Sequence, residues 1–266
     1  MVISQCPKRN PRPNPRPRTS PRQKSRPAPN AGPAEGVSKT SNPNANERKK
    51  RRMIYRNPHV LARYGHRFFQ TQNEQRYKDW KGRFENQTLF VCASGPSLTL
   101  DDIHTISELN HPIFVTNNTF FLVPNAAALF FHDPPWWRKY KDDVERIFSG
   151  ECITPSLVPE QRVLSLHGTD FNAFGNSGAA AISFGIYTKA SKIICLGLDC
   201  KFDKDGKTHW HGSHVRGLGD AKSLPKWFER FDELALYAKE NNVKVINASR
   251  DTDLESFECI QLEDLL

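Results

Sequence analysis

Polar residues that could bind a phosphate or move a proton follow five apolar runs in this sequence. The runs are short and rich in strand-forming residues, and each stops where the polar residues begin. In a parallel sheet the carboxyl ends of the strands share one edge, and ligands bind there. We therefore expect the following residues to gather at one edge of a sheet: Ser94-Gly95-Pro96-Ser97, Asn117-Asn118, Asp133, Asp199 and Asn247-Ala248-Ser249.

The first of these segments, "ASGPSL", connects a strand-like run to a helix-like one. Gly95 lets a ligand come close to the backbone, and Pro96 fixes φ while removing one N–H. The amides of Gly95, Ser97 and Leu98 are then predicted to be free to face an anion at a helix N-terminus. The alternative interpretation is a plain capped turn.

Two helix starts carry small or polar residues. Thr99 followed by Asp102 resembles a capping pair. Asn176 and Ser177 lead into a second helix, where Gly178 and three alanines form the first turn. Two amide-rich helix starts in one domain suit the phosphates of a nucleotide. Close packing of a helix on a sheet would select the same small residues.

Asp133 ends another apolar run and precedes two prolines. A carboxylate in that position could accept hydrogen bonds from a ribose, a base or an acceptor hydroxyl. Trp136 and Trp137 follow, and they could form an aromatic wall or belong to the core.

Three histidines lie within six residues, at His209, His211 and His214. The spacing H-x-H-x-x-H is not a standard structural zinc pattern, and no cysteine supports it. We prefer one histidine as a general acid or base, because its pKa lies near neutrality. Lys207 and Arg216 could offset the charge of a phosphate leaving group.

A tight turn is expected at Lys204–Lys207. It predicts a hairpin in which Lys201–Phe202 pairs with Thr208–Trp210. His209 and His211 would then share one face of an extended segment.

Short apolar runs alternate with helical patterns, which predicts an α/β fold with a mainly parallel central sheet in one Rossmann-like domain. An amphipathic stripe of Trp227, Phe231, Leu234 and Tyr237 is expected to lie in the core. The expected strands are 88–93, 113–116, 127–132, 151–154, 162–166, 192–198 and 244–247. The expected helices are 100–109, 135–148, 177–190 and 224–241.

The N-terminal residues 1–56 differ sharply in composition from the rest of the chain. They hold 15 Lys and Arg against 2 Glu, a net charge of +13, and 10 of the 19 prolines. Such a segment is predicted to be a disordered basic arm, because it has too little apolar surface to bury. It could be a tether, or it could bind nucleic acid or another polyanion, centred on Glu47–Arg52. A helical lead-in at 57–86 and a Rossmann-like domain at 87–266 follow.

Neither a secretion signal nor a membrane span is expected, because the sequence has no long apolar stretch. The six cysteines include no CxxC pair. These features predict a reducing, cytoplasmic setting.

Five segments in this order resemble one superfamily: "ASGPSL", the runs ending in Asn117-Asn118 and Asp133-Pro134, "GNSGAAAISFGI…KIICLGLDCKF", and "DGKTHWHG". It includes bacterial sialyltransferases that use a CMP-activated sugar, motility accessory factor glycosyltransferases, and archaeal hydroxymethylpterin diphosphokinase-like proteins. The resemblance covers about residues 88–250.

For the sialyltransferase branch, the resemblance implies a metal-independent, inverting displacement with no obligatory cofactor. His209 matches the histidine that acts as general base on the acceptor hydroxyl. The branch has two tyrosines that stabilise the departing phosphate, whereas here Phe202 stands in that region and the loop has no tyrosine. The resemblance implies that the CMP-type donor is held by the Gly-Pro-Ser loop around Gly95, by Asn118 or its neighbour Asn117, by Asp133 (where that branch usually has Asn) and by Ser177-Gly178. Asp133 is expected to orient the donor or the acceptor. From their places at strand ends and helix starts, we add Ser94, Pro96, Ser97, Asn176 and Asp199 to the candidate nucleotide-binding residues.

The diphosphokinase-like branch implies ATP, Mg²⁺ and transfer of a diphosphate to a hydroxymethyl group. Asp133 and Asp199 would then be candidate Mg²⁺ ligands. We interpret the chain as a nucleotide-dependent transferase, with glycosyl transfer ahead of diphosphate transfer and an unidentified acceptor. A catalytically idle nucleotide-binding module, tethered by the arm, is the other alternative.

Overall fold

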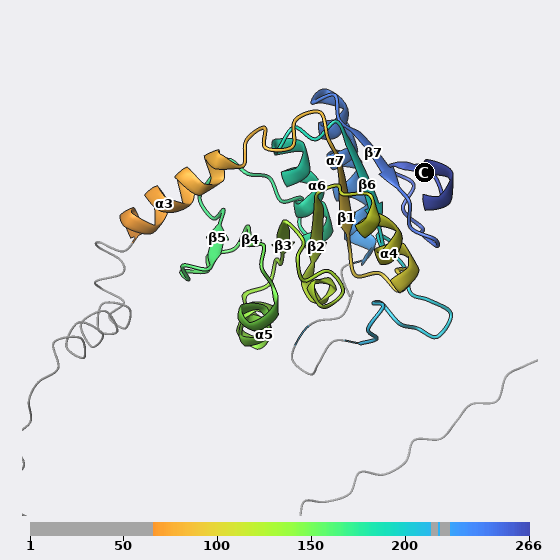
Figure 1. Cartoon of the computed structure of the whole chain (residues 1–266), viewed down its shortest axis with the longest axis horizontal. Coiled ribbons are helices and arrows are strands. Elements are labelled where there is room, and N and C mark those ends of the chain that lie inside the picture. The colour runs from red at the N-terminus through yellow and green to blue at the C-terminus, as the bar shows by residue number, and fades with distance from the viewer. Residues whose placement is uncertain (1–65, 214–217, 219–223) are drawn as a thin grey trace, which may run out of the picture. The chain divides into compact units, whose positions relative to one another are not determined.

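The computed structural model describes residues 66–213, 218 and 224–266. Eight strands form one sheet in the order β5-β4-β3-β2-β1-β6-β7-β8, and all seven pairings are parallel (Figure 1). The strands are β1 (Thr88–Cys92), β2 (Ile113–Thr116), β3 (Ala128–Phe130), β4 (Glu151–Thr154), β5 (Val163–Ser165), β6 (Lys192–Leu196), β7 (Lys244–Asn247) and β8 (Glu258–Cys259). The α/β class with a parallel central sheet is thereby confirmed.

Helices cover both faces of the sheet, so that the described chain has two apolar layers. One layer packs α6 (Ser177–Tyr187) and α7 (Leu224–Glu240) onto the sheet, together with the end of α3 (His66–Asp79). The other holds α4 (Leu100–Glu108), α5 (Pro134–Ile147) and the short 3-10 helices η2 (Asn117–Phe121) and η3 (Leu262–Leu265). Alternate residues of β1 face the two layers, as the period of a strand requires.

The switch in strand order lies between β1 and β6. The chain runs outward from β1 to β5 and then returns to place β6 on the other side of β1. At such a point the two connections leave the sheet in opposite directions, which opens a crevice beyond the carboxyl ends of the strands. The crevice beyond the carboxyl ends of β1 and β6 is therefore the expected ligand-binding site of this fold.

Several helices and strands begin or end at other residues than the sequence predicted. The strand predicted at 192–198 stops at Leu196, because Gly197 turns the chain with φ of +63°. The helix predicted at 177–190 ends at Tyr187, and Lys189 follows with φ of +59°. Three elements were not predicted: η2 directly after β2, η3 near the C-terminus, and β8, whose two residues are both exposed and carry no apolar pattern.

The predicted hairpin after Cys200 is wrong. The tight turn itself is present, since the Asp203 and Lys207 backbones are joined by an N–H to C=O bond of 2.9 Å. However, Lys201–Phe202 and Thr208–Trp210 do not form paired strands, and the segment consists of bends and turns. His209 and His211 therefore lie on a turn, with their rings stacked at 5.2 Å between centroids.

The lead-in contains α3, which covers the edge strand β5. The Arg76 guanidinium donates to the carbonyls of Gln161 and Val163, both at 3.2 Å, and pairs with Glu151. The basic arm and residues 57–65 lie outside the described residues, as do His214 and Arg216.

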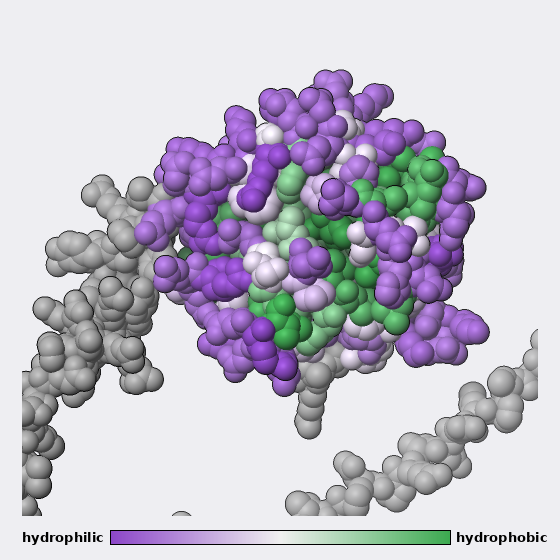
Figure 2. All heavy atoms as spheres, viewed as in Figure 1, coloured by the Kyte–Doolittle hydropathy of each residue, from purple (hydrophilic) through white to green (hydrophobic). Residues whose placement is uncertain are grey.

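The surface is mainly hydrophilic, although some apolar side chains reach it. Figure 2 shows hydrophobic residues in the middle of one face, with hydrophilic residues around them. Among the described residues, none of the helices has the length and apolar character needed to cross a membrane.

Candidate functional site

The loops that follow β1 and β6 touch each other at the switch point. The Gly95 N–H donates to the Gly197 carbonyl at 2.7 Å. A Cβ on Gly95 would lie 2.4 Å from that carbonyl oxygen and 2.5 Å from the Asp199 carboxyl carbon. Glycine at position 95 is therefore required by this close approach of two loops, independently of any ligand.

Asp199 occupies the part of the Gly95 loop where an anion was expected. Its Oδ2 accepts from the Ser97 N–H at 2.6 Å, and its Oδ1 accepts from the Ser97 hydroxyl at 2.6 Å. The Leu98 N–H donates to the Gly95 carbonyl at 3.2 Å. All three amides that were predicted to be free are thus engaged within the protein, so that prediction is wrong for this conformation.

Burial raises the pKa of the Asp199 carboxyl to about 6. The side chain is only 2% exposed, which penalises its charged form. The two hydrogen bonds from Ser97 act in the opposite direction, while the charge of Asp251 adds to the rise and Lys201 opposes it. Asp199 is therefore a buried carboxyl held in place by one serine.

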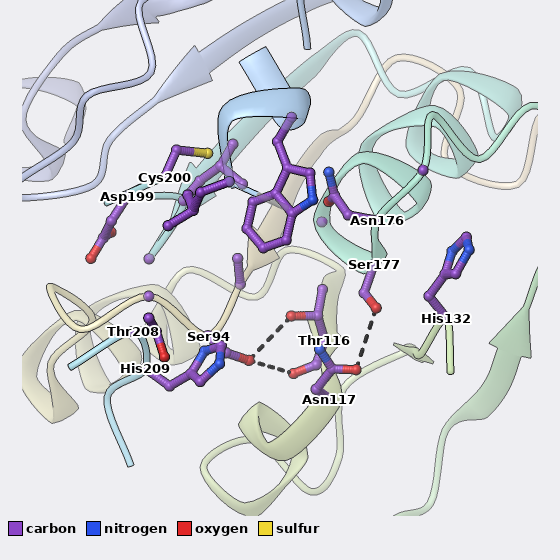
Figure 3. Close-up of a pocket in the computed structure, with 18 of the residues that line it drawn as sticks. Ser94, Thr116, Asn117, His132, Asn176, Ser177, Asp199, Cys200, Thr208 and His209 are labelled. Carbon is purple, nitrogen blue, oxygen red and sulfur yellow. Dashed lines mark hydrogen bonds between the residues drawn. The ribbon is translucent and has the colours of Figure 1, made fainter. Parts of the chain in front are cut away.

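A cavity of about 570 Å³ opens beyond the carboxyl ends of β1, β2, β3 and β6. Its volume lies in the range typical of small-molecule sites. Polar residues on its walls come from six segments of the chain, and most of them are labelled in Figure 3: Ser94, Thr116, Asn117, His132, Asp133, Asn176, Ser177, Asp199, Lys201, Thr208, His209 and Lys226. The gathering of strand-end residues expected from the sequence is thus present for four of the five segments, and Asn247–Ser249 do not line the cavity.

The start of α6 presents several hydrogen-bond donors to this cavity. Asn176 caps the helix by accepting from the Ala179 N–H at 2.8 Å. The next two amides, on Ser177 and Gly178, have no intrahelical acceptor, because they belong to the first turn. The side-chain Nδ2 of Asn176 is buried and has no partner among the described residues. Together with the positive end of the helix dipole, these groups favour an anion.

Neighbouring residues fix the geometry of this helix start. The Ser177 hydroxyl donates to the Asn117 Oδ1 at 3.3 Å, and Asn117 has a left-handed backbone with φ of +45°. A Cβ on Gly178 would lie 3.1 Å from Leu198 Cδ1. Gly178 is therefore selected partly by helix–sheet packing, as the alternative interpretation held.

His132 and Asp133 follow β3 on the adjoining wall. The His132 Nδ1 is buried and lacks a hydrogen-bond partner within the described residues. A buried polar atom without a partner costs about 1–3 kcal/mol, so a ligand that supplied one would be favoured. Asp133 is exposed, and its side chain does not cap α5. Its carboxylate is thus accessible at the rim of the cavity.

The loop that carries His209 is docked onto the end of β1. The Trp210 N–H donates to the Ser94 carbonyl at 3.1 Å, and its indole N–H donates to the Thr119 hydroxyl at 3.3 Å. The Gly212 N–H closes a turn on the His209 carbonyl at 2.9 Å. Figure 3 shows His209 next to Ser94, with Ser177 and His132 farther along the cavity.

Some of the predicted residues do not line the cavity. Asn118 is buried in the core, where its amide accepts from the Trp136 indole at 2.7 Å and donates to the Tyr140 hydroxyl at 3.2 Å. Lys207 is exposed and does not line the cavity. Pro96 and Ser97 do not line it either. Trp137 stacks on Phe131 in the core, whereas the equally buried Trp136 touches the cavity.

Other residues of the cavity were not predicted. Lys226 and Trp227 reach it from the first turn of α7, and Lys201 reaches it from the β6 side. The Lys201 ammonium is paired with Asp251 and Asp253, so its charge is largely offset. The only sequence signal was the apolar stripe of α7, which we had assigned to the core.

The two candidate magnesium ligands do not fit a metal site in this arrangement. Both Asp199 oxygens accept hydrogen bonds from Ser97, and Asp133 lies at the exposed rim. Within the described ranges, no three His, Cys, Asp or Glu side chains are grouped so that they could hold a metal ion.

The chain was also compared with known proteins. It matches no protein-family model, no curated protein and no solved structure. The geometry of the cavity is therefore the basis for assigning a function.

The buried Asp199 carboxyl predicts an unusual pH dependence of stability. Its folded pKa of about 6 exceeds the reference value of 3.8. The folded state thus binds more protons between these values, and its stability falls as pH rises through them. Replacing Asp199 by Asn removes this penalty. Relative to the wild type, the variant's free energy of unfolding should be higher at pH 7 than at pH 3.5 by on the order of 2 kcal/mol.

Denaturant unfolding at several pH values measures this difference. Ser97→Ala is the matched comparison, because it keeps the carboxyl but removes one hydrogen bond to its charged form. In Ser97→Ala, the pH range over which the free energy of unfolding falls should shift to higher pH. If the difference in free energy of unfolding between Asp199→Asn and wild type does not change with pH, the raised pKa of Asp199 is contradicted.

Proposed function

We propose that this protein is a nucleotide-dependent glycosyltransferase, which moves a sugar from a CMP-type donor to an acceptor hydroxyl. The observation that supports this most directly is the group of unsatisfied donors at the start of α6, in a cavity that also contains His209. The order of the sequence motifs, which resembles the sialyltransferase-like superfamily, supports the same proposal.

The donor phosphate binds at the α6 start in this proposal. The amides of Ser177 and Gly178 and the Nδ2 of Asn176 supply uncompensated donors there. Lys226 adds a positive charge on the cavity wall, without an ion pair in the described part of the chain. The Gly95 loop is a poor second site, because Asp199 already fills it and would repel a phosphate.

His209 acts as the general base. The acceptor oxygen attacks the anomeric carbon of the donor, and the bond from that carbon to the phosphate oxygen breaks. The electron pair of that bond leaves with the nucleotide phosphate, and the hydroxyl proton passes to His209. A histidine suits this step because its ordinary pKa is close to neutral pH.

The departing phosphate needs stabilisation that the absent tyrosines do not give. Lys207 was a candidate, but it does not line the cavity, and Arg216 lies outside the described residues. We assign this role to His132, whose Nδ1 has no partner in the described part of the chain, and to Lys226. Both reach the cavity that contains the α6 start.

Diphosphate transfer with ATP and Mg²⁺ is the weaker alternative. It needs carboxylate oxygens that are free to bind the metal. Asp199 is only 2% exposed, and each of its oxygens already accepts a hydrogen bond from Ser97, so it is poorly accessible to a hydrated metal ion. We derive no mechanism through that route.

Asn176→Asp tests the phosphate site without disturbing the fold. Asp caps a helix about as well as Asn, so stability should stay within about 0.5 kcal/mol. The variant loses the Nδ2 donor and places a negative charge beside the phosphate. We expect CMP and CDP to bind roughly 10- to 100-fold more weakly, as measured by calorimetric titration.

Asn176→Ser is the matched control, because it caps the helix and adds no charge. It should lose only the single donor, with an affinity about two- to fivefold lower. If wild-type protein shows no thermal stabilisation by CMP, CDP, UDP, ATP or GTP, with or without Mg²⁺, the proposal fails. Stabilisation by ATP that requires Mg²⁺ would favour the diphosphokinase alternative.

His209→Ala tests the assigned base. Release of CMP from a CMP-activated sugar should slow by about 10²- to 10⁴-fold, while CMP affinity stays within about threefold. His211→Ala keeps the base and removes a ring that stacks on His209 and contacts Trp210, so its rate should fall less than about tenfold. Unchanged turnover in a folded His209→Ala protein would refute the mechanism.

We also propose that the basic arm binds a nucleic acid or another polyanion. Residues 1–56 carry a net charge of +13, whereas the rest of the chain carries −4. Changing the five basic residues of 48–52 to Gln in the full-length chain should weaken binding to a DNA or RNA oligonucleotide. The salt dependence of binding should also become less steep, because fewer counterions are released. Equal affinity and equal salt dependence in the two proteins would contradict this assignment.

A further inference from the structure

The cavity has an aromatic and aliphatic wall as well as a polar end. Leu224, Trp227 and Phe231 reach it from α7. Leu224 and Phe231 are buried, whereas Trp227 is only partly buried. An apolar surface beside an anion-binding helix start would suit a ligand that is charged at one end and has a planar ring at the other.

Trp227 differs from the other four tryptophans of the chain. Trp80, Trp136 and Trp137 are at most 3% exposed and pack against other aromatic rings. Trp210 is held by the hydrogen bond from its indole to Thr119. Within the described part of the chain, Trp227 makes neither a ring–ring contact nor an indole hydrogen bond, although it lines a cavity.

The position of α7 brings Trp227 close to the start of α6. A Cβ on Gly175, just before that start, would lie 3.8 Å from the Arg230 side chain. Trp227 is three residues earlier on the same face of α7, one turn nearer to the helix start. Because α7 begins at the cavity, Trp227 lies on the cavity side of Arg230.

The two sides of the α6 start therefore differ in chemistry. On the β3 side stand the polar His132 and Asp133, and also Trp136, which is only 2% exposed and stacks on Phe131. On the α7 side stands Trp227, with Leu224 and Phe231 beside it. Because Trp136 and Phe231 are at most 2% exposed, Trp227 is the aromatic residue of the cavity wall whose side chain is most accessible for stacking on a nucleotide at the α6 start.

We propose that the Trp227 indole stacks on the nucleobase of the bound donor. This inference rests on the proposed function, and it adds that the ligand is recognised by its base as well as by its phosphate. Stacking of a base on an aromatic side chain is typically worth a factor of about ten or more in affinity. It places the base on the α7 side and the transferred sugar on the His132 side.

Calorimetric titration with two ligands tests the stacking. CMP carries a base, a ribose and a phosphate, whereas ribose 5-phosphate carries the ribose and the phosphate without a base. Trp227→Leu should weaken CMP binding about tenfold, while Trp227→Phe, which keeps an aromatic ring, should stay within about threefold. Neither variant should change the affinity for ribose 5-phosphate.

Tryptophan fluorescence gives a second readout. Binding of CMP should quench part of the emission of the wild type, and that part should be missing from Trp227→Phe. An equal loss of affinity for both ligands, or no loss for either, would overturn the stacking proposal.

Comparing CMP binding by the wild type, Trp227→Leu and Asn176→Asp distinguishes a failure of the stacking proposal from a failure of the proposed function. If CMP binds to wild type and Trp227→Leu alike, and Asn176→Asp still weakens it, only the stacking is refuted. If the wild type binds no nucleotide at all, the proposed function fails and the stacking with it. Melting temperatures of the two Trp227 variants within a few degrees of wild type show that the changes in affinity are not due to unfolding.

Discussion

The close approach of the loops after β1 and β6 is the constraint on which the rest of this site depends. Parallel strands at a switch point must send their connections to opposite faces, so the two loops part at the crevice. Here they are held together by the Gly95–Gly197 bond and by the two hydrogen bonds from Ser97 to Asp199. A carboxyl that is 2% exposed is costly to keep charged, which is why its pKa is raised to about 6.

This constraint is the reason why we place the proposed phosphate site at the start of α6 and not in the Gly95 loop. The loop that looks most like a phosphate loop is filled by the protein's own carboxylate, and the open donors lie across the cavity at the start of α6. The same closure presents the Ser94 carbonyl to Trp210, and that contact brings His209 to the cavity. The loop that carries the proposed base is therefore docked onto one of these two loops, while the proposed donor site lies at the start of α6.

The sequence predicted the fold and the gathering of strand ends well, because both follow from local periodicity and the rule for parallel sheets. It also predicted the cap at Thr99, which is a local interaction. Predictions from the sequence were wrong where a residue's hydrogen-bond partner is distant in the chain. Asp199 lies 102 residues from Ser97, and no local pattern shows that the two residues are in contact. The prediction that Asn118 contacts the ligand was wrong for the same reason, because its side-chain amide is hydrogen-bonded to Trp136 and Tyr140. Trp227 packs against the core, as the apolar stripe of α7 predicted, but the stripe does not reveal that this residue also lines the cavity.

The central claim is that donor phosphate binds at the start of α6. A crystal structure of the full-length protein with CDP tests it most directly. We predict phosphate oxygens within hydrogen-bonding distance of the Ser177 and Gly178 amides, with the Ser97–Asp199 contact intact. Phosphate density in the Gly95 loop, with Asp199 displaced from Ser97, would contradict the account.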